Sequence, residues 1–116
     1  MKTLILYMPK SKTLLGAASF QKMFANAIGE GYAIASTELL HIVPGCNVVL
    51  LDVETRQRAE GKVRMLTTHR PDSKTNSGMG RYDVHMEQLR MVEYAAPPPI
   101  SPSQKAARYR GIQFVG

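Results

Sequence analysis

A cluster of arginines and lysines in this chain has a spacing that indicates anion binding. Residues 44–66 read PGCNVVLLDVETRQRAEGKVRML and carry four cations within nine positions, Arg56, Arg58, Lys62 and Arg64. Cations held side by side on a rigid hairpin attract anions such as nucleic-acid phosphates. The candidate nucleic-acid-binding residues are Arg56, Arg58, Lys62, Arg64, Arg81, Tyr109 and Arg110.

The positive charge is unevenly distributed along the 116 residues, whose formal net charge is +6. Residues 53–81 carry seven bases against three acids, and residues 96–116 carry three bases and no acid. Residues 1–52 have a net charge of only +1. Positive charge gathered in two segments favours a face that binds anions. The alternative is that the charge only keeps the protein soluble.

Tyrosines accompany the bases and offer a second means of contacting nucleic acid. Tyr82, Tyr94 and Tyr109 are candidate stacking platforms for unpaired bases, although Tyr82 and Tyr94 can equally face the core. The segment KAARYRG at 105–111 resembles a flexible arm that becomes ordered on nucleic acid, although short basic tails are also common as solvated ends.

Other chemistries lack their signatures. The three histidines fit no zinc-site spacing, so no metal is expected, and we expect His85 to pair with Asp83 or Arg81. The acids between residues 52 and 60 lie among arginines, which favours ion pairing over acid–base catalysis. A GxSxG motif and a phosphate-binding P-loop are both absent. We therefore predict a protein that is not an enzyme and binds no cofactor.

Hydrophobic periodicity predicts the elements that must position these residues. An apolar stripe from Phe20 to Ile28 repeats at helical spacing and predicts a helix over 16–28, ended by Gly29. A β-branched run and an alternating run predict a hairpin of strands 47–53 and 59–66. The remaining expected elements are strands at 3–8, 32–35, 81–86 and 91–94, a short helix at 37–42 and a helical turn at 87–89.

This order of elements predicts a small α+β domain over residues 1–95. It should hold a curled, mostly antiparallel sheet or pseudobarrel with one main amphipathic helix. Residues 96–116 are predicted to be a proline-rich linker and a basic tail, in which 111–115 is either a last strand or a frayed end. The rival to nucleic-acid binding is a protein-interaction or homo-oligomerisation module that uses this proline-rich segment.

Cysteine usage and hydropathy indicate the compartment. Cys46 is the single cysteine, so no intramolecular disulfide can form, and it is expected to be a buried structural thiol. The apolar run at 4–7 is too short for a signal peptide, and nothing approaches a membrane span. We expect a cytoplasmic protein that does not contact membranes.

The turn and strand PGCNVVLLD at 44–52, followed by the strand RAEGKVRML at 58–66, resembles the PUA-like superfamily, which includes the EVE and ASCH domains. The resemblance covers about half the chain. It implies a β-pseudobarrel that binds RNA or modified DNA. No site residue of that superfamily is carried over to this sequence.

Overall fold

The structure is a computed structural model that describes residues 2–8, 20–53, 55–69, 80–95 and 111–115. Its elements are β1 (Thr3–Tyr7), α1 (Phe20–Asn26), β2 (Ile28–Ile34), α2 (Ser36–Leu39), β3 (Asn47–Asp52), β4 (Gln57–Thr68), β5 (Gly80–Val92) and β6 (Ile112–Val115). The predicted hairpin is confirmed, because β3 and β4 pair in antiparallel register from Asn47 opposite Lys62 to Asp52 opposite Gln57.

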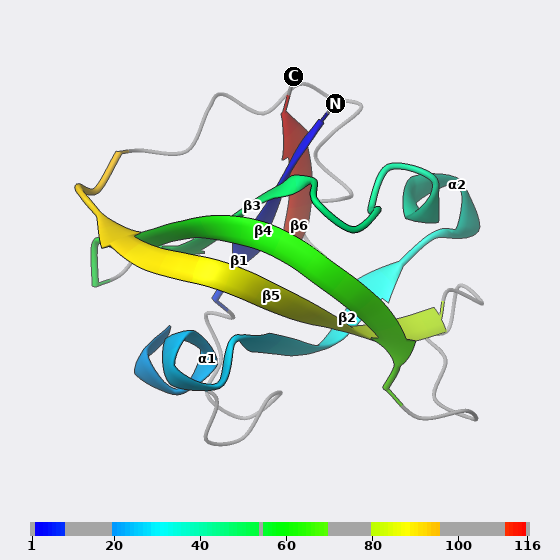
Figure 1. The fold of residues 1–116 in the computed structure, drawn as a ribbon, viewed down its shortest axis with the longest axis horizontal. Helices are drawn as coiled ribbons and strands as arrows, with labels where there is room; N and C mark the ends of the chain where they lie inside the picture. The colour runs from blue at the N-terminus through cyan, green and yellow to red at the C-terminus, as the bar shows by residue number, and fades with distance from the viewer. Residues whose placement is uncertain (1, 9–19, 54, 70–79, 96–110, 116) are drawn as a thin grey trace.

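The strands form one six-stranded sheet in the order β2-β5-β4-β3-β1-β6. β1 runs parallel to β3, and the other neighbouring pairs are antiparallel. The sheet curls into a half-barrel in which the long strands β4 and β5 arch across the molecule (Figure 1). The expectation of a curled, mostly antiparallel sheet is therefore confirmed, and the described chain is mostly sheet with two short helices.

Alternating side chains give this sheet two faces that carry separate apolar clusters. On β1, Leu4 and Leu6 point into the main core, where α1 adds Phe20 and Met23. We call this side of the sheet the core face. Ile5 and its neighbours pack into a second cluster on the opposite face, whose buried members are Ile5, Tyr7, Val49 and Leu51.

Helix α1 ends earlier than its apolar stripe predicts. Ala27 follows the helix with φ of 55°, and Ile28 already pairs with His85 as the first residue of β2. The predicted cap at Gly29 is therefore wrong. Gly29 lies inside β2, where an added Cβ would stand 3.0 Å from Leu6 Cδ1, so this glycine serves close packing.

Strand β5 also differs from the sequence prediction. A helical turn at 87–89 was expected to separate two strands, yet residues 80–92 form one strand of 13 residues. The irregularity at this point is a β-bulge at Gln88, whose φ is 56°. Local sequence pointed to a break, but pairing with β4 on both sides of the bulge keeps the strand continuous.

The last strand joins the sheet at the edge beside β1. Leu6 pairs with Ile112 and Thr3 with Val115, so residues 112–115 belong to the sheet rather than to a frayed end. The two ends of the chain consequently lie close together (Figure 1). Neither described helix has the length and apolar character needed to cross a membrane.

A buried tyrosine links the two ends of the sheet across the core. Tyr32 on β2 donates a hydrogen bond of 3.0 Å to the carbonyl of Tyr7 on β1, and the Tyr7 amide donates to the Gly111 carbonyl at 2.8 Å. Burial raises the pKa of the Tyr32 phenol well above its usual value, so the group stays a donor. This contact helps to hold the curl of the sheet.

We predict that Tyr32→Phe lowers the free energy of unfolding by about 1–2 kcal/mol, because it leaves the Tyr7 carbonyl without this donor in a buried site. Denaturant unfolding measures the loss. Tyr94→Phe is the matched control, since the Tyr94 hydroxyl makes no hydrogen bond within the described residues, and it should change stability by less than about 0.5 kcal/mol. Equal losses for the two variants would contradict the role given to Tyr32.

The raised pKa of Tyr32 also predicts a dependence of stability on alkaline pH. The unfolded phenol ionises near pH 10, whereas the folded one holds its proton to higher pH. The contribution of Tyr32 to the free energy of unfolding is therefore complete below about pH 10. It is lost as the pH rises through the pKa of the folded protein. Unfolding free energy measured from pH 8 to 11.5 should fall less steeply for Tyr32→Phe than for the wild type. Parallel curves would contradict the prediction.

Candidate functional site

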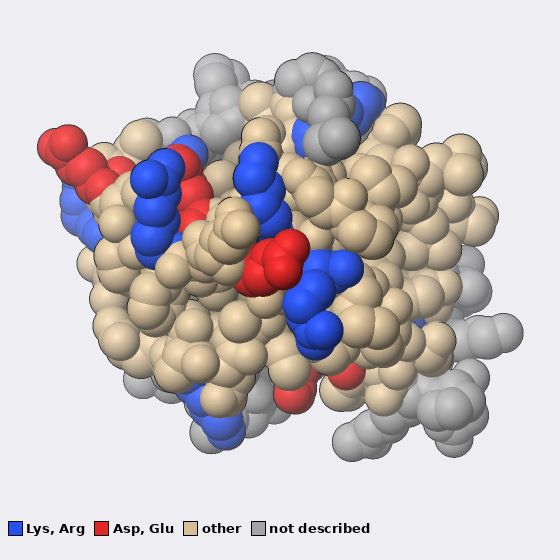
Figure 2. Space-filling view, in the orientation of Figure 1, with Lys and Arg blue, Asp and Glu red and all other residues tan. Residues whose placement is uncertain are grey.

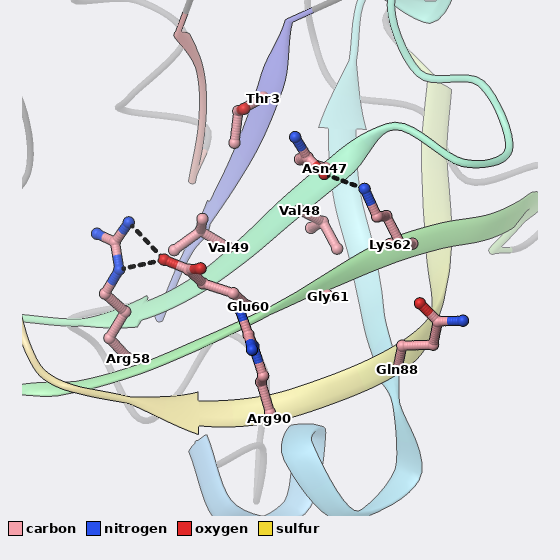
Figure 3. A pocket seen from close by; sticks show the side chains of 10 residues that line it. All are labelled: Thr3, Asn47, Val48, Val49, Arg58, Glu60, Gly61, Lys62, Gln88 and Arg90. Carbon is pink, nitrogen blue, oxygen red and sulfur yellow. Dashed lines mark hydrogen bonds and ion pairs between the residues drawn. The ribbon is translucent and has the colours of Figure 1, made fainter.

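A hollow of about 460 Å³ lies on the opposite face of the sheet, between β1, β3, β4 and β5 (Figure 3). Three of its lining residues are cations, Arg58, Lys62 and Arg90, and one is an acid, Glu60. The full lining consists of Thr3, Asn47, Val48, Val49, Arg58, Glu60, Gly61, Lys62, Gln88 and Arg90.

Strand register brings the charged side chains of the hollow together. Glu60 pairs with Val49 on one side and with Arg90 on the other, and directly opposed residues share a face. Lys62 pairs with Asn47 in the same way. Since side chains alternate along a strand, residues 58, 60 and 62 of β4 all project on this face. The hollow therefore gathers charged side chains from β4 and β5.

The charged side chains of the hollow differ in whether they already make hydrogen bonds or ion pairs within the protein. Arg58 donates from Nε and Nη2 to Glu60 Oε2 at 3.2 and 3.1 Å. Lys62 Nζ donates to Asn47 Oδ1, and both contacts are drawn in Figure 3. Arg90 is exposed and has no hydrogen bond or ion pair with another residue in the described part of the chain. Arg90 is thus the cation in the hollow that is most open to a ligand.

The β-bulge in β5 determines that Arg90 faces the hollow. Between two paired positions β4 advances from Glu60 to Lys62, while β5 covers one residue more, from Arg90 to Glu87. An extra residue in one strand moves every side chain beyond it to the other face. Leu89 consequently packs against the main core, and Arg90 projects beside Glu60.

Gly61 makes room for this bulge. A Cβ added at Gly61 would lie 2.7 Å from the carbonyl oxygen of Glu87 and 3.2 Å from Cα of Leu89. Both neighbours are backbone atoms of the bulged strand, which cannot turn away as a flexible side chain can. The glycine inside the predicted strand is therefore the residue that permits the bulge and, through it, the position of Arg90.

Arg64 lies on the same strand but does not line the hollow. A second irregularity places Val63 opposite Met86 and Met65 opposite His85, so β4 holds one extra residue there. Arg64 and Met65 are both exposed, and Leu66 packs against the core instead of Met65. The alternating run of residues 59–66 predicts Met65 on the same side as Val63. This is wrong, because the bulge shifts the inward positions by one residue.

Arg56 stacks on a tyrosine at the end of the hairpin. Its guanidinium carbon lies 4.6 Å from the centroid of the Tyr94 ring, a cation–π distance. Tyr94 also packs against the second apolar cluster, and Tyr82 packs against the main core. The structure therefore favours a packing role for Tyr82 and Tyr94 over a role as stacking platforms for bases. One face of the Tyr94 ring is already occupied by Arg56.

Arg81 is held by the backbone of the neighbouring strand. Its Nη1 donates to the Gly31 carbonyl at 2.7 Å, while the Gly31 amide donates to Asp83 Oδ1 at 3.0 Å. His69 Nδ1 pairs with the same carboxylate oxygen at 2.7 Å. These contacts fasten β2 to β5, and Arg81 does not line the hollow.

The expected partner of His85 is corrected by the structure. Its Nε2 lies 2.8 Å from Thr67 Oγ1 across the β4–β5 pair, instead of pairing with Asp83 or Arg81. Asp83 is engaged by His69, which explains the difference. Among the described residues, no three His, Cys, Asp or Glu side chains gather in a way that would hold a metal ion. Cys46 is buried and free, as its position predicted.

Of the seven candidate residues, Arg58 and Lys62 meet in the hollow. Tyr109 and Arg110 lie outside the described residues, so their role stays a prediction. Sequence reasoning missed Arg90, because the expected break at 87–89 interrupted the alternation that would have linked it to the hairpin. The glycine within the predicted strand was the available signal, since glycine in a strand often marks a bulge.

Basic and acidic side chains are interleaved over the stretch of surface where β4 and β5 run (Figure 2). The described bases on this face therefore do not form an unbroken positive surface. An anion that binds here meets local groups of cations separated by carboxylates. Such a surface favours a discrete contact in the hollow over a long phosphate track.

Comparisons with protein-family models, with curated proteins and with solved structures found no match.

We predict that Gly61→Ala destabilises the protein by about 1–3 kcal/mol, because the added Cβ overlaps the backbone of the bulge. Denaturant unfolding measures the loss. Arg64→Ala, an exposed change on the same strand, should stay within about 0.5 kcal/mol. A Gly61→Ala protein as stable as the wild type would show that the close approach of the two strands is not required.

Proposed function

We propose that this protein is a non-catalytic nucleic-acid-binding module whose hollow between β3, β4 and β5 contacts phosphates. One observation carries the proposal: Arg58, Lys62 and Arg90 meet around one hollow, and Arg90 has no partner among the described residues. Cations that converge on a concave surface raise the local positive potential and attract phosphate oxygens. Contacts of this kind fix the position of a nucleic acid without reading its sequence.

The same proposal extends to the fold and to its ligand class. We take the half-barrel as a form of the PUA-like pseudobarrel that the sequence resembles, with RNA or DNA as the ligand class. The curled sheet with α1 on its core face supports this reading, because it leaves the hollow on the opposite face uncovered by either described helix. A reducing cytoplasm is the compartment we propose, in keeping with the free thiol of Cys46.

The other candidate cations contribute differently in this proposal. Arg56 lies just before β4 and Arg64 lies within it, on either side of the hollow, and each offers one further phosphate contact beyond it. Arg81 contributes least, since the Gly31 carbonyl already holds its guanidinium. Tyr109 and Arg110 are kept as a basic arm, in a part of the chain outside the described residues.

We predict that affinity for a single-stranded oligonucleotide falls with salt, with a log–log slope of about −2 for the three cations of the hollow. Arg90→Gln should weaken binding roughly three- to tenfold at all sequences alike and reduce the slope by about 0.7. Fluorescence anisotropy with labelled RNA and DNA 12-mers at 50–200 mM salt measures both quantities. Lys22→Gln, the same charge change on α1, should alter affinity by less than about twofold.

Two results would contradict the proposed function. The first is the absence of binding at 50 mM salt by a folded wild-type protein. The second is an equal loss of affinity in Arg90→Gln and Lys22→Gln, which would reflect net charge alone. If Arg90→Gln instead changes the mass measured by light scattering and leaves nucleic-acid affinity unchanged, the rival homo-oligomerisation module replaces the proposal.

A further inference from the structure

An acidic side chain stands in the middle of the hollow that we propose for phosphates. Glu60 accepts two hydrogen bonds from Arg58, lies opposite Arg90, and is followed two residues later by Lys62. Directly opposed side chains in an antiparallel pair are about 5 Å apart at Cβ. The carboxylate is therefore bound to one of the three cations and lies on the same face of the sheet as the other two.

The pair between Glu60 and Arg58 is open enough to be exchanged. The Glu60 side chain is 38% exposed and that of Arg58 is 19% exposed. An ion pair at such a site contributes little to stability, since water screens it. A ligand that brings more negative charge than the carboxylate can take over the guanidinium while Glu60 turns toward solvent.

The charge of the incoming phosphate decides whether this exchange is favourable. An internal phosphodiester carries one negative charge, as Glu60 does, so replacing the carboxylate gains little. A phosphate monoester carries about −1.5 to −2 charges at pH 7 and has three strong acceptor oxygens. It can accept from Arg58, Lys62 and Arg90 together, which no single carboxylate does.

We infer that the hollow is a subsite for the terminal phosphate monoester of a nucleic-acid strand, with Glu60 as a resident competitor that disfavours internal phosphodiesters. The inference rests on the proposed function and names the part of the nucleic acid that the site selects. The volume of about 460 Å³ suits one terminal nucleotide, since ligand sites span roughly 300–1,000 Å³.

A strand end is favoured over a small phosphorylated molecule because the basic row continues beyond the hollow. Arg64 follows Lys62 on β4 and is exposed, and Arg56 precedes Arg58. Neither residue lines the hollow, so neither is needed for a lone phosphate. Each lies beyond one end of the hollow, so one of the two can contact the phosphates that follow a terminal nucleotide along its strand.

The experiment compares one 8-mer sequence in three forms, with a 5′-phosphate, with a 3′-phosphate and with hydroxyls at both ends. The fluorophore is attached to an internal base. Anisotropy at 100 mM salt should show at least a tenfold tighter Kd for one phosphorylated form than for the hydroxyl form. Glu60→Gln should tighten binding of the hydroxyl form severalfold and reduce the preference below about threefold.

Glu87→Gln is the matched control. Glu87 is exposed, lies opposite Lys62 and makes no ion pair within the described residues, so this change removes the same charge nearby without touching Arg58. The preference for a terminal phosphate should survive it. If Glu87→Gln erases the preference as fully as Glu60→Gln, charge density alone explains it, and the role of Glu60 is overturned.

The outcomes separate the inference from the proposed function. Equal affinity of the wild type for all three forms overturns the inference and leaves nucleic-acid binding intact. Absence of binding to any form overturns both. Uridine and adenosine 5′-monophosphate serve as competitors. If they compete as strongly as the unlabelled phosphorylated 8-mer, the ligand is a small phosphorylated molecule, and the inference of a strand end is overturned.

Discussion

One extra residue in β5 determines which side chains share a face with the basic hairpin. Gln88 takes a left-handed conformation with φ of 56°, which is costly for a residue other than glycine and must be supported by its surroundings. Gly61 provides that support, because the bulged backbone occupies the space that a Cβ would fill. Without the bulge, Arg90 would point into the core and Leu89 toward solvent. The site and the core thus depend on the same local irregularity.

The remainder of the fold keeps this strand pair curved and in place. The main core fills the inside of the half-barrel, and the Tyr32 hydrogen bond to β1 joins the two ends of the sheet. On the opposite face, the apolar cluster around Ile5 and Leu51 ends where the charged rows of β4 and β5 begin. The chain therefore places its apolar and charged side chains side by side on one surface, and a hollow forms at their boundary.

Sequence periodicity predicted the elements that depend on local patterns. The hairpin was predictable because residues 47–52 are largely aliphatic and residues 58–63 alternate, and this also placed Arg58 and Lys62 on one side. Gly61 signalled that a bulge could lie nearby, but the position of the bulge was not predictable, since it depends on the approach of Gly61 to a strand that begins about 20 residues later. The end of α1 at Asn26 also depends on a distant strand, because pairing of Ile28 with β5 overrides the helical stripe. The partners of Arg81 and His85 lie on other strands, so no local pattern identifies them.

In the function that we propose, phosphate binds in the hollow beside Arg90. An amide chemical-shift titration of the isotope-labelled protein with a short single-stranded oligonucleotide tests it most directly. The largest shifts are expected on three segments that are separate in sequence and adjacent in the sheet, residues 47–49, 60–62 and 88–90. Saturable shifts confined to other segments, such as the Arg81 and Asp83 stretch of β5, would contradict it.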